Sequence, residues 1–359
     1  MRCALLTTGL LALATTAAAQ GTANERSVVS GVMVRGYDID GGNRTTQLAV
    51  PIAVVIPVNS RFAFDIGTYY ASTSSEPAGG SRTTFSGLTD TQLRASYMFG
   101  QDAVVTTLMV NLPTGSDQKL SEAGVTGAAS ANFLSFPVNS YRNGLSVTGG
   151  VAVATQLGAW NVGLAGSVRL NNEFTPFSDD SLKYTPGTEG RVKLGVDRLI
   201  GSSRLQIGFT WSTFGNDAFT NLGGGSGSYQ AGDRLIGEAT LTFLAGSGTL
   251  SAFVWNYYRS KADGASTSNQ ENIFSGGLSG HWPLGRRVRL IPVIEGRLWS
   301  PDQGNGRMFG AGASVEVPVG DRFVFSPGAR FDLGRLEFQD GTDHNLTGWG
   351  LSALLRYRI

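Results

Sequence analysis

Aromatic residues recur eight residues apart on three separate segments of this 359-residue chain. The pairs are Phe62 with Tyr70, Phe323 with Phe331, and Trp349 with Tyr357. Because eight is even, both rings of a pair point to one face of a β-strand, and at about 3.3 Å per residue they lie roughly 26 Å apart. A strand tilt of about 40° reduces this to roughly 20 Å, close to the apolar band of an outer-membrane barrel between its aromatic girdles. The spacing therefore predicts an all-β fold, a transmembrane antiparallel β-barrel.

Other aromatic residues divide into two belts when the strands are placed by this pattern. One belt points outward near short turns and contains Tyr97, Trp160, Phe243, Trp282 and Phe323. The other points outward near long polar stretches and contains Tyr70, Trp211, Phe331 and Trp349. Core packing would explain any single ring, whereas two belts are typical of the two interfaces of a membrane.

Short turns alternate with long polar stretches along the chain. The short turns, each flanked by period-2 runs typical of hairpins, are Val58-Asn59-Ser60, Gly100-Gln101-Asp102, Gly158-Ala159, Gly201-Ser202-Ser203, Ala245-Gly246-Ser247-Gly248, Leu284-Gly285-Arg286 and Gly320-Asp321. The polar stretches are 72–84, 113–143, 172–184, 214–230, 260–271 and 334–346. Short periplasmic turns and long extracellular loops are typical of outer-membrane barrels. We expect about sixteen strands, within a range of about twelve to eighteen, with both termini on the periplasmic side.

The first nineteen residues have the pattern of a secretory signal peptide. Arg2 supplies the positive start, residues 5–13 the apolar stretch, and residues 17–19 a small-residue cleavage site. We therefore expect a signal peptide over 1–19, a barrel over 20–359 and export to the bacterial outer membrane. The single cysteine, Cys3, lies within the signal, so the mature chain has no disulfide framework.

Net charge and hydropathy are both close to zero. The formal net charge of +1 argues against a nucleic-acid partner, which would require a basic surface. The mean hydropathy of −0.02 is what a barrel gives, because lipid-facing and lumen-facing residues alternate and their contributions cancel. The expected partners are therefore outer-membrane lipid and small-molecule solutes, with the oligomeric state open.

The pattern of the last strand predicts a further partner, the machinery that assembles outer-membrane barrels. Trp349, Leu351, Ala353, Leu355, Tyr357 and Ile359 alternate with polar or small residues. This resembles the terminal signal that the bacterial barrel-assembly machinery recognises, except that Ile359 stands where that signal usually has Phe or Trp.

A family resemblance is carried by two short motifs. They are Gly87-Leu88-Thr89-Asp90-Thr91, followed by Leu93, Ala95 and Tyr97, and Asn111-Leu112-Pro113-Thr114-Gly115. Over roughly residues 45–120 the chain resembles the putative outer-membrane transporter family named for the meta-pathway of phenol degradation, with Thr89 in place of the family's second glycine. The resemblance implies passage of small compounds, aromatic ones among them, across the outer membrane. The chain is also distantly similar to fatty-acid and aromatic-hydrocarbon uptake channels. Those channels have an N-terminal hatch, for which a first strand that begins near Ser27 leaves no room.

The motif residues themselves indicate structure rather than chemistry. We expect Asp90 and Thr91 where an extracellular loop enters a strand, and Pro113, Thr114 and Gly115 where the partner strand ends. Proline lacks the N–H that a strand ladder needs and is therefore suited to a strand end. We predict that these residues shape loops.

Charged residues are expected on the lumen face, because a lipid-facing charge costs about 2–4 kcal/mol at mid-membrane. The pore-lining candidates are Arg94, Arg169, Arg191, Lys193, Arg204, Arg234, Glu238, Arg289, Glu295, Arg297, Arg330 and Arg356, with Arg358, Asp65, Glu189, Glu316 and Asp332 on the same face. Two interpretations stay open: Arg and Lys rings that favour anionic solutes, or opposite charges that pair across strands and fill space.

The stretch 113–143 is the longest of the polar segments. Its middle, 120–135, is rich in alanine and small residues. It either folds into the lumen as a constriction, with a short helix, or remains a solvated external loop.

Signals for catalysis or metal binding are weak. His281 falls on a lumen face with Ser275 and Ser279, but no carboxylate is placed by sequence to orient its ring, as a hydrolase would need. Two histidines and no mature cysteine give no metal cluster, and we expect no cofactor. The sequence therefore predicts a passive, non-enzymatic channel for small molecules, with aromatic or anionic compounds as the candidate solutes. The alternatives are a barrel hydrolase of lipid or peptide that uses His281, and a structural or adhesive surface barrel.

Overall fold

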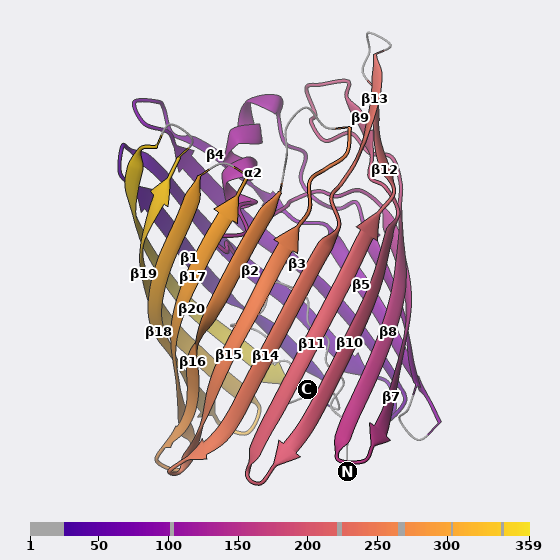
Figure 1. The fold of residues 1–359 in the computed structure, drawn as a ribbon, viewed down its shortest axis with the longest axis vertical. Helices are drawn as coiled ribbons and strands as arrows, with labels where there is room; N and C mark the ends of the chain where they lie inside the picture. Colours follow the sequence, from indigo (N-terminus) through magenta and orange to yellow (C-terminus); the bar gives the residue numbers. More distant parts are fainter. Residues whose placement is uncertain (1–24, 101–103, 221–224, 265–269, 303, 339–340) are drawn as a thin grey trace.

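The chain forms a closed antiparallel barrel of sixteen strands (Figure 1). The computed structural model describes residues 25–100, 104–220, 225–264, 270–302, 304–338 and 341–359. The first half of the wall consists of β1 (Ser27–Ile39), β2 (Asn43–Pro57), β3 (Phe62–Glu76), β4 (Thr83–Leu88), β5 (Thr91–Phe99), β6 (Val104–Leu112), β7 (Ser146–Leu157), β8 (Trp160–Asn171) and β10 (Glu189–Ile200). The second half consists of β11 (Ser203–Phe214), β14 (Arg234–Ala245), β15 (Gly248–Arg259), β16 (Glu271–Leu284), β17 (Val288–Pro301), β18 (Asn305–Val319), β19 (Phe323–Glu337) and β20 (Asp343–Arg358).

Each wall strand pairs with its neighbours in the chain, and the ring closes where the first strand meets the last. β1 pairs with β20 from Ser27 opposite Arg358 to Ile39 opposite Leu346. β4 and β5 follow one another along β3 and together make one wall strand. The prediction of about sixteen strands is therefore confirmed.

Strand alternation produces an apolar exterior. In β20, for example, Trp349, Leu351 and Leu355 point outward and are exposed, whereas the alternate residues face the lumen. Because β-strand side chains alternate, the register carries this division around the whole ring. An exterior of exposed Val, Leu, Ile and Phe is stable in lipid and not in water.

The aromatic belts lie where the sequence predicts them. At the end that holds the termini, Tyr97 and Phe323 are exposed on the exterior, and at the opposite end Tyr70, Trp211 and Trp349 are. Outward aromatic rings at both ends of the wall match the two interfacial girdles of a membrane barrel.

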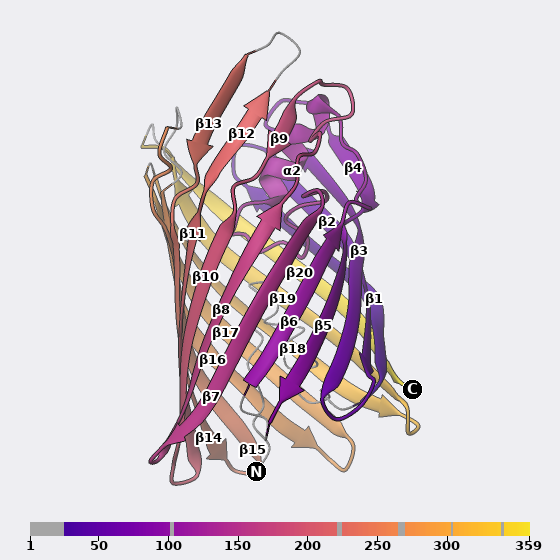
Figure 2. The same cartoon turned by 90° about the vertical axis from the view of Figure 1, so that its right-hand side faces the viewer.

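The short connections lie, as far as the structure describes them, at the end of the barrel where β1 begins and β20 ends (Figures 1 and 2). Six of them contain a glycine with positive φ, namely Gly100, Gly158, Gly201, Gly246, Gly285 and Gly320, a conformation that glycine adopts without steric cost. Residues 101–103 of the turn after β5 lie outside the described residues.

At the opposite end of the barrel, some of the predicted loops are partly strand. Two predicted loops, 72–84 and 334–346, are largely strand, because β3, β4, β19 and β20 extend beyond the aromatic belt. Polar strand ends are stable there because water replaces lipid around them.

Two of the other predicted loops contribute to a small separate sheet. It consists of β9 (Lys183–Thr185), β12 (Asn216–Thr220) and β13 (Ser226–Gln230), which rise above the rim in Figure 2.

The chain also contains two short helical elements, η1 (Leu120–Glu122) and α2 (Ala123–Ala129). Neither they nor any other helix of the described residues is long and apolar enough to cross a membrane. The predicted signal peptide, 1–19, lies outside the described residues, and its cleavage stays a prediction.

Neighbouring residues of β7 test the lipid-facing assignment. Val151 points outward and is 48% exposed, whereas Ala152 faces the lumen opposite Ala165. We expect Val151→Arg to lower the free energy of unfolding by about 2–4 kcal/mol, the cost of a lipid-facing arginine at mid-membrane. Urea titration of the protein refolded into phospholipid vesicles measures this. The control, Ala152→Arg, should change it by much less, and equal losses would contradict the assignment.

Candidate functional site: a constriction in the barrel

The segment between β6 and β7 folds into the extracellular end of the lumen, which is the first of the two alternatives that the sequence left open for 113–143. Its helix α2 packs against β2, β3 and β4 (Figure 1). Val125, Val138 and Tyr141 of the segment are buried against Phe85 and the small residues of β2 and β3. The segment is therefore part of the interior and not a solvated external loop.

The segment also reaches the opposite wall. Phe133 and Phe136 are buried among Tyr37, Ile273 and Met308, which come from β1, β16 and β18. Strands β6 and β17 lie on opposite sides of the sixteen-stranded ring, so a segment rooted at β6 that contacts β16 and β18 crosses the lumen.

A β-bulge in the wall receives the root of this segment. Tyr70 pairs with Leu88 and Gly67 pairs with Gln92, so the β4–β5 strand has one residue more than β3 over this stretch. An extra residue bends a strand and redirects its side chains. Here the redirected residue is Asp90, which is buried.

Asp90 holds both ends of the crossing segment. Its carboxylate accepts hydrogen bonds from the Gly115 backbone N–H (2.9 Å), the Asn143 backbone N–H (2.7 Å) and the Asn111 side-chain amide (2.9 Å). Its own backbone N–H donates to the Tyr141 carbonyl. One buried carboxylate thereby satisfies donors from the start and the end of the segment, which fixes the entry and the exit together.

The other motif residues complete this attachment. The Thr114 hydroxyl accepts from the Thr91 N–H at 2.8 Å and also lies 2.8 Å from the Thr91 hydroxyl. A Cβ on Gly115 would lie 2.2 Å from the Tyr141 carbonyl oxygen, so only glycine fits. Pro113 follows the end of β6, as expected for a residue without an N–H.

These positions correct one detail of the sequence analysis. Asp90 lies at a break between β4 and β5, inside a wall strand, rather than where an extracellular loop enters the strand. The alternation pattern missed this because a one-residue bulge leaves both flanking strands with normal period-2 sequences.

A second attachment is made by Gln47 of β2, which is buried. Its side-chain amide donates to the Val138 carbonyl at 2.7 Å, and its amide oxygen accepts from the Val138 N–H at 2.8 Å. It also donates to Thr73, whose hydroxyl lies 2.7 Å from that of Tyr141. Sequence reasoning missed Gln47, which stands on the lumen face of its strand between Thr45 and Ala49.

A third attachment lies on the far wall. Arg297 of β17 donates to the Phe133 carbonyl at 2.6 Å and to the Ser135 hydroxyl. Arg35 of β1 donates to the Ser135 carbonyl at 3.1 Å. Ser135 has a positive φ of 53°, an uncommon conformation for a residue other than glycine, and these bonds hold it in place.

Both arginines belong to a buried ion-pair network. Glu295, 1% exposed, accepts a hydrogen bond from Arg297 at 2.8 Å and forms an ion pair with Arg330 at 2.8 Å. Asp332, 0% exposed, accepts from Arg330 at 2.7 Å and from Arg35 at 3.1 Å. Removing one partner of such a network leaves a buried charge without a counter-charge and lowers the free energy of unfolding by about 3–5 kcal/mol. The network therefore gives the segment a rigid anchor.

Apart from this network, the register places every pore-lining candidate on the lumen face. Many candidates pair with a carboxylate. The ion pairs are Arg94 with Asp65, Arg191 with Glu189, Lys193 with Glu238, Arg204 with Asp197, and Arg289 with Glu316. Pairing across strands therefore accounts for much of the lumen charge, with Asp197 as a partner that the sequence analysis missed.

The lumen is nevertheless open to water beside several of these residues. The side chains of Arg94, Arg191 and Arg289 face the lumen but are 38%, 45% and 59% exposed. Side chains of a solidly packed interior would be buried. The crossing segment packs its apolar residues on β1–β4 and β14–β20, so the open side is the wall of β5–β11.

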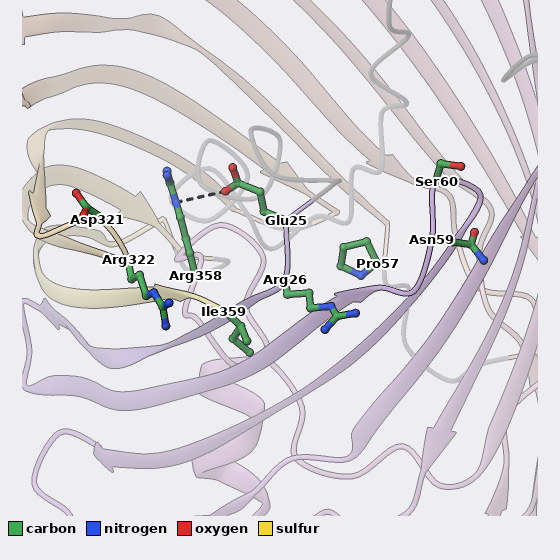
Figure 3. A pocket seen from close by; sticks show the side chains of 9 residues that line it. All are labelled: Glu25, Arg26, Pro57, Asn59, Ser60, Asp321, Arg322, Arg358 and Ile359. Atoms are coloured by element: carbon green, nitrogen blue, oxygen red, sulfur yellow. Dashed lines mark ion pairs between the residues drawn. The ribbon is translucent and has the colours of Figure 1, made fainter.

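A hollow of about 810 Å³ lies at the periplasmic end, where the first and last strands meet (Figure 3). Arg358 and Glu25 form an ion pair there at 3.3 Å, and the Ile359 N–H extends the closing ladder by donating to the Arg26 carbonyl. Charges of both signs line it, so it does not select a ligand of one sign.

The small external sheet is held by a buried polar cluster. The Tyr184 hydroxyl donates to Asp217 and lies 3.1 Å from the Tyr229 hydroxyl, and the other Asp217 oxygen accepts from the Gly187 N–H. Burial, reinforced by the bonds to Asp217 and Tyr229, raises the pKa of Tyr184 well above its usual range. The hydroxyl therefore remains a proton donor, and the sheet is an ordered feature of the mouth.

His281 lacks the partners that a hydrolase would need. It faces the lumen opposite Thr249, and no described residue makes a hydrogen bond to its ring. Ser275, the candidate nucleophile on the same face, donates instead to Glu295. Within the described ranges, no group of His, Cys, Asp or Glu is arranged to hold a metal ion.

Comparison with known proteins finds only remote similarity. No family model and no curated protein matches the chain. The barrel is similar to the CymD monoaromatic hydrocarbon channel, with 9% identity, 93% of this chain and 88% of that chain covered, and a TM-score of 0.46. It is similar to a Pseudomonas aeruginosa FadL homologue (11% identity, 93% and 90% covered, TM-score 0.44) and to an anion-selective porin from Comamonas acidovorans (12%, 93% and 98%, 0.41).

Similarity at this level carries no argument about the solute. The class of solute is therefore inferred from the residues of this chain. The family resemblance of residues 45–120 stays a prediction.

Asp90 provides a test of the attachment. Asp90→Ala removes an acceptor of three hydrogen bonds, each worth about 1.5–3 kcal/mol when the acceptor is charged. We expect amide hydrogens of residues 116–143 to exchange at least about tenfold faster, since about 1.4 kcal/mol is tenfold. Hydrogen exchange followed by mass spectrometry measures this in the refolded protein. Asp321→Ala, in a periplasmic turn, should leave these amides unchanged; an unchanged segment in Asp90→Ala would contradict the proposed role of Asp90.

Proposed function

We propose that this chain is an outer-membrane channel for the passive passage of small molecules, with a preference for anions. The observation that carries the proposal is the combination of an apolar exterior with lumen-facing arginines that water reaches. Arg191 and Arg94 are exposed inside the barrel, beside a segment that fills only part of its cross-section. A barrel that served only as a scaffold would not need a water-filled interior.

Placement in the outer membrane is supported by the two aromatic belts and the short turns. Closed barrels with an outward apolar band are the β-structures that satisfy all backbone groups within lipid. The termini and the short turns lie at one end, which is the periplasmic end of outer-membrane barrels.

The crossing segment sets the width of the passage. It is attached at Asp90, at Gln47 and at Arg297, and these residues come from three separate parts of the wall. Three attachments hold the segment in one position, so the free passage runs along β5–β11. Solutes must pass this wall, where arginine is the commonest charged residue.

An anion preference follows from the charges on that wall. Arginine guanidinium groups stabilise anions in a confined lumen and repel cations. The pairs with Asp65, Glu189, Glu238 and Asp197 reduce this effect and do not reverse it, because Arg169 and Arg234 of the same region have no carboxylate within ion-pair distance among the described residues. An aromatic solute, which the family resemblance implies, would be favoured as its carboxylate form.

Ion selectivity tests the proposal directly. In a planar bilayer with a KCl gradient, the refolded protein should give stable single-channel steps and a reversal potential of the sign for chloride preference. Arg191→Gln should move the reversal potential toward zero, and Arg61→Gln, in a periplasmic turn, should not. A cation-selective potential would contradict the anion preference, and a correctly folded barrel without conductance would contradict the channel.

The width of the passage gives a second prediction. Replacing residues 120–135 with a short Gly-Ser linker should raise single-channel conductance several-fold, because α2 and the contacts of Phe133 and Ser135 are removed. Shortening the exposed β3–β4 connection at 78–81 is the matched control and should leave conductance unchanged. Unchanged conductance in the first variant would show that the crossing segment does not limit the passage.

A further inference from the structure

Arg169, Arg191 and Arg234 come from β8, β10 and β14 and lie at the extracellular end of the barrel, at the edge of the open wall of β5–β11. Arg191 of β10 and Arg234 of β14 both pair with Ser212 of the strand between them, so their Cα atoms are two strand spacings apart, about 10 Å. Arg169 of β8 pairs with Glu189, the next lumen-facing residue of β10 beyond Arg191. It therefore lies about 7 Å further along the strands toward the extracellular side.

Arg169 lies within electrostatic reach of the other two arginines. Arg191 and Arg234 both act electrostatically on Arg169, as do Glu189 and Asp90. The oxygens of Asp90 already accept hydrogen bonds from Asn111, Gly115 and Asn143. Glu189 is bound to Arg191 at 2.6 Å. Arg259, opposite Arg234 on β15, is ion-paired with Glu271 at 3.5 Å.

The guanidinium groups of Arg169 and Arg234 keep donors free. Arg169 uses its Nε to donate to the Ser146 hydroxyl at 3.1 Å. Arg234 has its guanidinium carbon 4.6 Å from the centre of the Phe214 ring, and its Nε is buried without a hydrogen-bond partner. Stacking on Phe214 fixes the plane of the Arg234 group and leaves its edge available.

An arrangement of this kind is unfavourable without a counter-ion. Glu189 is paired with Arg191, and Asp90 contributes one more negative charge nearby. The guanidinium groups of Arg169 and Arg234 have no ion-pair partner among the described residues, and cations repel one another strongly where protein limits the access of water. A planar guanidinium edge matches a carboxylate or another oxyanion through paired hydrogen bonds. A ligand with two anionic oxygens could meet the guanidinium groups of Arg169 and Arg234 together, whereas a small monoanion could meet only one of them.

We propose that Arg169, Arg191 and Arg234 form a binding site for small dianionic oxyanions at the entrance of the passage. The site rests on the proposed channel function, and it gives the channel a class of solute: small dicarboxylates or compact inorganic dianions. An incoming dianion displaces water from the three guanidinium edges and passes from there along the wall of β5–β11.

Binding can be measured without any transport. Isothermal titration of the refolded full-length protein in detergent micelles, in chloride buffer of constant ionic strength, uses succinate and sulfate as probes. We expect saturable binding of at least one dianion, and no saturable binding of acetate over the same concentration range. Preference for succinate assigns the site to dicarboxylates, and preference for sulfate assigns it to inorganic dianions.

Variants distinguish a defined site from general lumen charge. Arg234→Gln should weaken dianion binding at least about tenfold, the effect of losing about 1.4 kcal/mol. Arg191→Lys keeps the charge without the paired edge and should weaken it by a smaller factor. The control Arg289→Gln removes an exposed lumen arginine near the periplasmic end and should not change it. Far-UV circular dichroism establishes that each variant has folded.

The outcomes separate this proposal from the channel function. Absence of saturable dianion binding in the wild-type protein, or equal loss in Arg234→Gln and Arg289→Gln, overturns the site even if the bilayer shows an anion-selective channel. Saturable binding that Arg234→Gln weakens supports the site even if the bilayer stays silent, in which case the channel proposal fails alone.

Discussion

The closure of the hydrogen-bond ladder between β1 and β20 is the constraint on which the rest of this molecule depends. Backbone N–H and C=O groups inside lipid have no water to bond to, so a spanning sheet cannot keep free edges. Once the ring is closed, strand alternation assigns each side chain to lipid or lumen, and a one-residue shift would exchange the two faces. The register from Ser27 to Arg358 thereby fixes which arginines face water inside the barrel.

The crossing segment is attached to the wall of this closed barrel in two different ways. Near its root, the backbone N–H groups of Gly115 and Asn143 both donate to one buried carboxylate, that of Asp90. This single side chain therefore holds together the two ends of a loop of about thirty residues. At its far end, backbone carbonyls meet arginines whose own charges are balanced by Glu295 and Asp332. The first attachment determines where the segment leaves the wall, and the second determines how far it extends.

Much of the fold was predictable from sequence because it depends on local period-2 patterns. Turn residues such as Gly158 and Gly320, and the outward position of Trp349 and Phe331, follow from alternation and glycine chemistry alone. The bulge at Asp90 could not be predicted from sequence, since an inserted residue leaves the alternation of both flanking strands intact. The attachments of the segment could not be predicted either, because Gln47 and Val138 are 91 residues apart and Arg297 and Phe133 are 164 apart. No local pattern records such pairs, and the polar sequences of β12 and β13 do not resemble strands that need burial.

The position of the crossing segment also has a mechanical meaning. A wide ring of strands around water is a thin shell, which flattens easily because little inside it resists a change from round to oval. A segment rooted at β6 and bound to Arg297 on the opposite wall connects the two sides that would move apart or together in such a change. It acts as a cross-brace, so the shape of the whole lumen, including parts that it never touches, depends on tension and compression along those residues.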